Sequence, residues 1–487
     1  MTQRIVRALA IGLLASPLLA VGCGSSSDNG GTGGSNIVKY DAGSGGTGGS
    51  SLDGAVPHVD SGAVDLAIGP DTALPIDTTV ADTAVVDAPI GPDVAIQLDT
   101  ATVDVAPVID TTPAIDLAPV VAVCTETTKF SGGTVTANRT LSQACSPYTI
   151  SSNLNVNKGA TLTIEPGTTL KFDSDTYLYV YAGAIFNAVG TAAAPIVMTS
   201  SKAAPAAGDW VGFQVQNSAN SVTLKYVTVE YAGYGDNVAV DITNANADVE
   251  NCFIHDNAAV GLDATGAIKG AKVLANTFYS NGDVPLVISD GVQADATNTF
   301  HSGTLVNTKQ VVSFAGTIAS TRTFDITEIP YFLAGNLNIN KTANVTVNAG
   351  VTFTFASDTY LYIYAGAIFT AVGTATSPII FTSSKAVPTQ GDWVGLSFQN
   401  GSSSITIKYA TIQYAGFGSG YAVDATNSTF DIENCTIQHN LSGGLDGTGA
   451  THSTLKNSSF GDNNADGTTI MDWTVPAATN TISGNTP

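Results

Sequence analysis

Charged side chains are scarce in this sequence of 487 residues: Asp, Glu, Lys and Arg together make up 12% of it. Gly, Ala, Thr, Asn, Ser and Val fill the space instead, a composition that favours strands and tight turns. Long amphipathic helices have little material to form, so we expect an all-β folded part. Cations are the scarcest: 17 Lys and Arg face 40 Asp and Glu, which gives a net charge of −23. This balance argues against nucleic acid and anionic lipid as partners.

Histidine is also rare, and the histidines show no spacing typical of metal ligands. We therefore expect neither a metal nor another cofactor. The five positions concerned are His58, His255, His301, His439 and His452.

The N-terminus has the features of an export signal. Arg4 and Arg7 precede an apolar run that ends in small residues before Cys23, a pattern typical of a secretory signal and not of a membrane span. It resembles the lipobox of bacterial lipoproteins, which implies a signal peptide over residues 1–22, lipidation of Cys23 and a membrane anchor. Gly24 follows the cysteine, which in the Gram-negative sorting rule favours the outer membrane or cell surface. An ordinary signal with an incidental cysteine is the alternative.

Residues 23–123 cannot build a core. A Gly/Ser-rich part is followed by a part rich in Asp, Pro, Ala and Val, and the stretch holds fourteen aspartates and one lysine, Lys39. Such a segment repels itself and stays extended. We expect a disordered tether whose span lies between about 55 Å as a coil and about 300 Å when extended.

The remainder of the chain is a tandem duplication. TYLYVYAGAIF from Thr176 returns as TYLYIYAGAIF from Thr359, and the same offset of 183 residues relates one half to the other. We divide the folded part into copy 1, residues 124–307, and copy 2, residues 308–487. Whatever one copy binds, the other is expected to bind as well.

Within each copy, short strand-like runs recur with a period of about 25 residues. This period predicts a solenoid in which each coil buries one face by stacking on its neighbours. The segments ATLTIEPGTTLKF, GAIFNAVGTAAAPIVMTS and GDWVGFQV resemble the right-handed parallel β-helix repeats of the pectin-lyase-like superfamily. The resemblance implies that fold from about Thr127 onward, as one continuous helix or two jointed ones. It also implies a ladder of stacked turn asparagines, formed by Asn251, Asn276, Asn434 and Asn457.

The cysteines after Cys23 divide by role. Cys124 and Cys145 bracket the start of copy 1 in an exported protein, and we expect a disulfide between them. Cys252 and Cys435 are the same position in the two copies, too far apart to pair. We expect each to be a small buried thiol.

No catalytic motif stands out. The Asn-Thr-Asp, Asp-Asp, Gly-His-Gly and Arg-Ile-Lys strings of pectin-degrading hydrolases are absent from the sequence. Asp173 with Asp175, His255 with Asp256, and Asp263 are the candidate acid–base groups, but several of them change between the copies. Variable exposed loops explain that pattern more simply than a second, decayed site. The GDW elements at Asp209 and Asp392 are interpreted as fold corners.

The best recognition candidates are tyrosines. Alternation in YLYVY sends Leu178 and Val180 to one face and the tyrosines to the other, a surface suited to stacking on sugar rings. Tyrosines packed against neighbouring coils are the structural alternative. The ligand-binding candidates are Tyr177, Tyr179, Tyr181, Tyr360, Tyr362 and Tyr364.

From these observations we expect a non-catalytic, lipid-anchored surface protein that presents a β-helical rod for adhesion or glycan binding. Its expected partners are the membrane, through the lipid anchor, and a polysaccharide or cell-surface glycan. Two alternatives stay open: a polysaccharide lyase or glycoside hydrolase, and a structural envelope protein.

Overall fold

The computed structural model describes residues 123–216, 218–236, 238–267, 270–463, 473–475, 480–483 and 485–486. All of them belong to one structural unit, residues 110–487. The expected signal peptide, the lipidation site Cys23 and the tether up to residue 122 lie outside the described residues. The described residues contain no helix with the length and apolar character of a membrane span.

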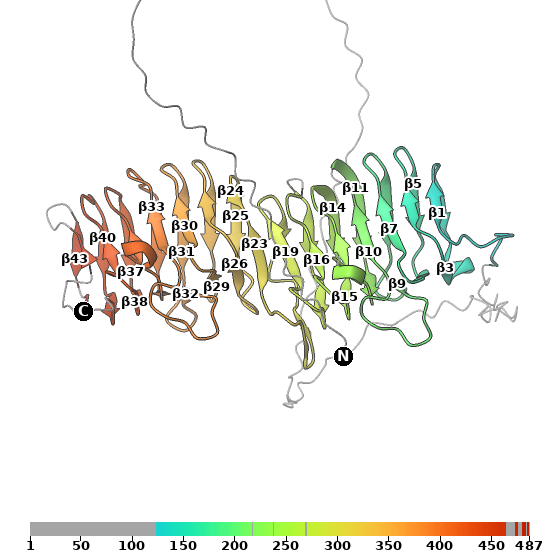
Figure 1. Ribbon diagram of the computed structural model, residues 1–487. Coiled ribbons are helices and arrows are strands. Elements are labelled where there is room, and N and C mark those ends of the chain that lie inside the picture. Colours follow the sequence, from blue (N-terminus) through green and yellow to red (C-terminus); the bar gives the residue numbers. More distant parts are fainter. Residues whose placement is uncertain are drawn as a thin grey trace, which may run out of the picture. The chain divides into compact units, whose positions relative to one another are not determined.

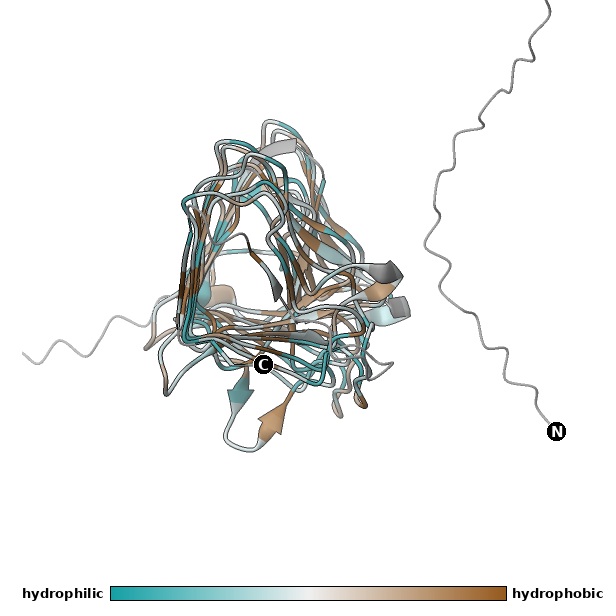
Figure 2. Ribbon diagram, turned by 90° about the vertical axis from the view of Figure 1, so that its left-hand side faces the viewer, coloured by the Kyte–Doolittle hydropathy of each residue, from teal (hydrophilic) through white to brown (hydrophobic). Residues whose placement is uncertain are grey.

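Short parallel strands follow one another around a triangular cross-section, which Figure 2 shows along the axis of the solenoid. Apolar residues alternate with polar ones along each strand, and the apolar set fills the interior. In the strand Tyr177–Val180, for example, Leu178 and Val180 are fully buried while the two tyrosines are half-exposed. The chain is therefore an all-β parallel β-helix, as the sequence predicts.

Each coil contributes one strand to each of three sides (Figure 1). The first, which we call the tyrosine side, carries β7 and β30, the strands of the predicted tyrosine rows. Its strands are β1 (Gly133–Val135), β4 (Leu154–Val156), β7 (Tyr177–Val180), β10 (Gly212–Val215), β13 (Val240–Asp241), β16 (Leu262–Asp263) and β19 (Leu286–Ser289) in copy 1, and β24 (Thr317–Ile318), β27 (Leu337–Ile339), β30 (Tyr360–Ile363), β33 (Gly395–Phe398), β36 (Val423–Asp424), β39 (Leu445–Asp446) and β42 (Trp473–Thr474) in copy 2.

The second side follows the tyrosine side in every coil. Its strands are β2 (Arg139–Leu141), β5 (Thr161–Ile164), β8 (Ile185–Val189), β11 (Ser218–Lys225), β14 (Ala245–Glu250), β17 (Lys272–Leu274) and β20 (Gln293–Ala294) in copy 1, and β25 (Thr321–Phe324), β28 (Asn344–Val347), β31 (Ile368–Val372), β34 (Ile405–Lys408), β37 (Phe430–Glu433), β40 (Thr454–Lys456) and β43 (Thr481–Ser483) in copy 2.

The third side closes the coil. Its strands are β3 (Tyr148–Ile150), β6 (Thr169–Phe172), β9 (Ile196–Ser200), β12 (Val227–Glu230), β15 (Phe253–His255) and β18 (Thr277–Tyr279) in copy 1, and β26 (Tyr331–Leu333), β29 (Thr352–Phe355), β32 (Ile379–Ser383), β35 (Ala410–Gln413), β38 (Thr436–Gln438) and β41 (Ser459–Gly461) in copy 2. An antiparallel hairpin of β21 (His301–Ser302) and β22 (Leu305–Val306), the strand β23 (Val312–Ala315) and the 3-10 turns η1 (Gln143–Cys145), η2 (Tyr234–Asp236) and η3 (Phe417–Ser419) complete the described elements.

The two copies form one continuous stack. β23 pairs with β19 of copy 1 and with β26 of copy 2, so a 14-stranded sheet passes from the tyrosine side of copy 1 to the third side of copy 2. The other sheets are interrupted between the copies, and a cleft of about 450 Å³ separates β20 from β25 on the second side. The question of one helix or two jointed ones therefore resolves to one helix with a junction.

Equivalent sides of the copies nevertheless face the same way. Asp290, after β19, accepts hydrogen bonds from Ala319 N at 2.9 Å and Ser320 Oγ at 2.8 Å, which places the turn after β24 against the turn after β19. Glu328, before β26, accepts from Phe300 N at 2.9 Å, which aligns the third sides. Figure 1 agrees, because the loops that follow β9 and β32 both project from the lower edge.

Arginines occupy the first coil of each copy. Arg139 lies over the Phe130 ring and bonds Glu126 at 3.3 Å, whereas Arg322 is buried under the last coil of copy 1. The Nη1 of Arg322 donates to Ser289 O at 3.2 Å and to a second carbonyl. The two arginines therefore cover the start of each core, as their matched positions in the sequence suggest.

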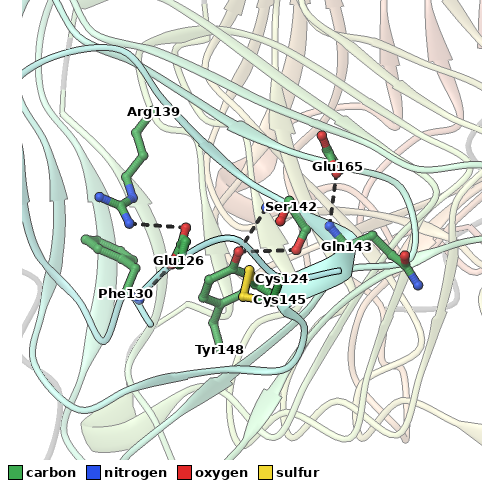
Figure 3. The surroundings of a disulfide bond; sticks show 9 residues. All are labelled: Cys124, Glu126, Phe130, Arg139, Ser142, Gln143, Cys145, Tyr148 and Glu165. Atoms are coloured by element: carbon green, nitrogen blue, oxygen red, sulfur yellow. Dashed lines mark hydrogen bonds and ion pairs between the residues drawn. A yellow bond between two sulfur atoms is a disulfide. The ribbon is translucent and has the colours of Figure 1, made fainter. Parts of the chain in front are cut away.

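A disulfide fixes the N-terminal cap of copy 1. Cys124 and Cys145 are bonded, and Figure 3 shows the bridge beside Tyr148, whose hydroxyl accepts a hydrogen bond from Ser142 N at 2.9 Å. The segment that carries Cys124 also brings Glu126 to Arg139. The disulfide thus holds the cap over the open end of the core.

The GDW corners bury a tryptophan and an aspartate together. Trp210 stacks on Phe172 with ring centroids 4.1 Å apart, and Trp393 stacks on Phe355 at 4.0 Å. Asp392 accepts hydrogen bonds from Lys385 Nζ at 2.6 Å and from a backbone amide at 2.9 Å. Burial opposes the charge of this carboxylate, but these bonds outweigh it and lower its pKa to about 2.

Two asparagine ladders run through the turns, and one differs from the prediction. Asn276 is buried and bonds Cys252 N and Asn298, as expected of a ladder residue. Asn251 instead adopts a left-handed conformation with φ 55°, and its register partner is Ala275, because the strands pair at a step of 24 and not 25. The predictions for Asn434 and Asn457 are wrong for the same local reason: they are left-handed turn residues with φ 56° and 50°, one position before the ladder.

The second ladder was not predicted. Buried amides bond from coil to coil at the corner after the third side, and in both copies they begin below an alanine amide. The members are Asn257, Asn281 and Asn307 in copy 1 and Asn440 and Asn463 in copy 2. The step of 24 residues from Asn257 to Asn281 was a signal for it in the sequence.

The remaining cysteines are buried free thiols. The Sγ atoms of Cys252 and Cys435 each lie 3.4 Å from a backbone oxygen of the preceding coil. Burial raises the pKa of both thiols to about 12. They are therefore protonated core residues and not reactive thiolates.

Candidate functional site

The tyrosine rows lie on the outside of the solenoid, with the same geometry in each copy. In copy 1 the ring centroids are 6.1 Å apart for Tyr177 and Tyr179, and 4.7 Å apart for Tyr179 and Tyr181. The corresponding distances in copy 2 are 6.2 Å and 4.9 Å. Tyr181 and Tyr364, at the ends of the rows, are each 37% exposed. The placement of Leu178 and Val180 inside and the tyrosines outside is as alternation predicts; ligand binding by the tyrosines stays a prediction.

A groove of about 640 Å³ lies beside the end of the copy 1 row. Its walls come from four successive coils, because β1, β4, β7 and β10 are consecutive neighbours in the sheet. The groove therefore runs parallel to the rod axis. It is lined by Thr134, Asn155, Asn157, Lys158, Tyr181, Ala182 and Gln216.

Copy 2 repeats every lining residue of this groove. At the offset of 183 residues stand Thr317, Asn338, Asn340, Lys341, Tyr364, Ala365 and Gln399, all of unchanged type. Positions beside them do change: Gly159 corresponds to Thr342, and Thr161 to Asn344. We call the seven-residue sets groove 1 and groove 2.

One hydrogen bond recurs in both grooves and shapes their walls. Gln216 Oε1 accepts from Ala182 N at 3.0 Å, and Gln399 Oε1 accepts from Ala365 N at 2.9 Å. The glutamine thereby ties the turn after the tyrosine strand to the following coil. The groove wall is thus the same in the two copies, down to this bond.

A lysine lies along each groove. The Lys158 stem passes over Gly183, where a Cβ would lie 3.1 Å from Lys158 Cγ, and Lys341 lies over Gly366 in the same way at 3.0 Å. Both glycines have positive φ, so the turn needs glycine for its backbone as well as for the lysine stem. Within the described part of the chain, no ion pair with a carboxylate involves Lys158 or Lys341.

The grooves combine groups that suit a sugar ligand. An exposed tyrosine ring offers a flat apolar face, and the amides, threonine hydroxyl and lysine offer hydrogen bonds to hydroxyl groups. Among the described residues, no cluster of three or more His, Cys, Asp or Glu side chains could hold a metal ion. The grooves therefore offer contacts for binding, with one titratable cation each.

Aspartates form a second repeated feature on the tyrosine side. Asp241 and Asp263 are register partners on β13 and β16, and Asp424 and Asp446 are register partners on β36 and β39. Burial and then the neighbouring Asp241 raise the pKa of Asp263. Sequence analysis singled out Asp263 but missed its partner, although an Asp-x-Thr spacing recurs at all four positions. In each case an aspartate oxygen accepts from the backbone amide two residues on.

The other acid–base candidates serve local structure. Asp173 accepts a hydrogen bond from Ser201 Oγ, and Asp175 is a turn residue with φ 63°. His255 bonds Asp256 at 2.8 Å and stacks on Tyr279 with centroids 4.4 Å apart. These groups sit on the third side and its corners, away from the grooves, and they do not converge on one point.

Comparison with known proteins supports the fold. A pectate-lyase-like β-helix domain model matches residues 133–241 and 316–429, and a model of right-handed β-helix regions matches residues 394–486. No curated protein and no solved structure matches the chain. The two family matches agree with the solenoid of the structure and identify its coils as right-handed.

Proposed function

We propose that this right-handed β-helix repeat protein is a non-catalytic glycan-binding protein, carried on the cell surface by an N-terminal lipid anchor. The observation that supports binding most directly is the pair of grooves, whose seven lining residues and glutamine bond recur in both copies. The wall of the rod varies around them, which favours a ligand-contacting role for the unvarying set. The third-side candidates for acid–base chemistry do not form a comparable site.

Binding is tested with the tyrosines. Replacing Tyr177, Tyr179 and Tyr181 by Ala in the full chain is expected to weaken glycan binding at groove 1 at least tenfold, because the exposed ring face is lost. Glycan-array binding followed by calorimetry on the strongest hit measures the effect. The matched control replaces the same tyrosines by Phe, which keeps the rings and should keep most of the affinity.

Two results would count against this proposal. Unchanged binding by the alanine variant would place the ligand elsewhere. Release of reducing ends or of unsaturated uronates from a polysaccharide panel would show that the protein is a hydrolase or a lyase, the alternative suggested by the pectate-lyase-like fold.

The surface location rests on the sequence before the solenoid. Cys23→Ser is expected to abolish labelling by radioactive palmitate and to move the protein from the membrane fraction to the soluble fraction, because the modified sulfur is lost. An anchored protein with Ser at position 23 would contradict the lipoprotein assignment. Ser25→Ala, two residues on, is the control and should leave both readouts unchanged.

A further inference from the structure

We infer that grooves 1 and 2 bind one linear, uncharged polysaccharide chain that runs along the tyrosine side, parallel to the rod axis. This inference rests on the proposed glycan-binding function and specifies its ligand and its mode of binding. It follows from the direction of the grooves, from their relative position and from the charges between them.

The grooves share a direction. Groove 1 takes residues from four consecutive coils, so its length runs across the strands and along the rod. A branched or compact sugar would use the width of a single coil, whereas a linear chain can occupy successive coils. Groove 2 has the same residues on four consecutive strands, β24, β27, β30 and β33.

The grooves also share a side. The contacts of Asp290 with Ala319 and Ser320 align the tyrosine sides across the junction. From β7 to β30 there are seven steps, through β10, β13, β16, β19, β24 and β27. At about 4.8 Å for each step, equivalent points of the two grooves lie roughly 35 Å apart along the axis. A single extended chain of that length can reach both.

The charges between the grooves indicate an uncharged ligand. A chain that leaves groove 1 toward groove 2 passes the register pair Asp241 and Asp263, and their carboxylates repel an acidic polymer. The lysine of each groove supplies one cation, against two aspartates on the same side of each copy. Carboxylate oxygens accept hydrogen bonds from sugar hydroxyls, so a neutral, hydroxyl-rich chain satisfies this row.

Two grooves on one chain give an advantage that depends on ligand length. Once one groove is occupied, the second binding event becomes intramolecular, which can raise the overall affinity by about 10²–10⁴-fold if both grooves are reached. A fragment that fills one groove gains nothing from the second. The length at which affinity rises therefore measures the distance between the grooves.

The test uses the full chain and size-fractionated fragments of linear glucan, xylan, galactan and mannan, with polygalacturonate as the charged comparison. For the neutral glycan that binds, we expect affinity to rise at least a hundredfold once fragments exceed roughly 35 Å. Tyr181→Ala and Tyr364→Ala should each abolish most of that rise and leave binding of short fragments to the intact groove unchanged. Tyr181→Phe and Tyr364→Phe should preserve the rise.

The outcomes separate this inference from the function on which it rests. Equal affinities for short and long fragments, with two fragments bound per chain, would overturn binding along the rod and leave glycan binding standing. Tighter binding of polygalacturonate than of every neutral polymer would overturn the uncharged ligand. Failure of every probe, short or long, would count against glycan binding itself.

Discussion

Replacing Trp393 by Ala is expected to lower the stability of the folded rod by about 3–5 kcal/mol, the usual cost of removing a large aromatic side chain from a core. Trp393 is fully buried, stacks on Phe355 with centroids 4.0 Å apart and donates its Nε1 hydrogen to Gln413 O at 2.8 Å. The variant leaves a cavity and an unpaired carbonyl in one coil. Urea unfolding followed by circular dichroism measures the loss.

The duplication supplies a matched variant for this experiment. Trp210→Ala removes the equivalent ring from copy 1 and should cost a similar amount, since Trp210 has the same stacking partner type and the same Nε1 bond, to Glu230 O at 2.9 Å. Phe417→Ala removes a ring that is 44% exposed and is the control, with an expected change of about 1 kcal/mol or less. A loss as large at Phe417 as at Trp393 would contradict the assignment of the tryptophans to the core.

Replacing Asn281 by Ala is expected to cost about 2–4 kcal/mol, because it leaves buried polar groups without partners. The Asn281 amide donates to Ile254 O at 2.9 Å and to Asn307 at 2.8 Å, and it accepts from Asn257 at 2.9 Å. Removal breaks the ladder at its middle member. Urea unfolding again measures the effect, and hydrogen exchange should show lost protection in the coils on either side.

Asn251 is the informative control for the ladder. The sequence predicts Asn251 as a ladder residue, but the structure gives it a left-handed backbone and Asn276 the ladder position. Asn251→Gly should therefore change stability by about 0.5 kcal/mol or less, because glycine adopts positive φ without strain. A loss similar to that of Asn281→Ala would show that Asn251 has a structural role that its conformation does not reveal.

The sequence predicts the coils well because alternation and period are local properties. Leu178 and Val180 point inward because strand side chains alternate, whatever the neighbouring coils contain. The repeat of about 25 residues similarly predicts stacking, since a single coil cannot bury its own apolar face. These two regularities lead to the fold class without any knowledge of long-range contacts.

The sequence does not predict features that depend on register between coils. A step of 24 residues in place of 25 moves the ladder from Asn251 to the next residue and changes which side chains meet. The passage of the continuous sheet through β23 from one side to the next is likewise invisible in the repeat, which is related by a constant offset. Both depend on small local insertions whose effect appears only when coils stack.

The candidate site is divided in the same way. The tyrosines were predicted from one strand, but the groove beside Tyr181 also needs Lys158 from the preceding coil and Gln216 from the following one. Asp241 similarly becomes the neighbour of Asp263 only through the pairing of β13 with β16. Sequence analysis finds one wall of such a site, and the stacking of coils supplies the others.

The junction at β23 makes the 183-residue copy a unit of length. Because the sheet changes sides there while the copies keep the same orientation, each copy extends the rod without rotating its grooves about the axis. A further copy joined through the same junction would lengthen the rod by roughly 35 Å and add one more groove in line with the first two. Gene duplication of this domain can thus increase the valency and the reach of the surface in a single step, with no new contact to be invented.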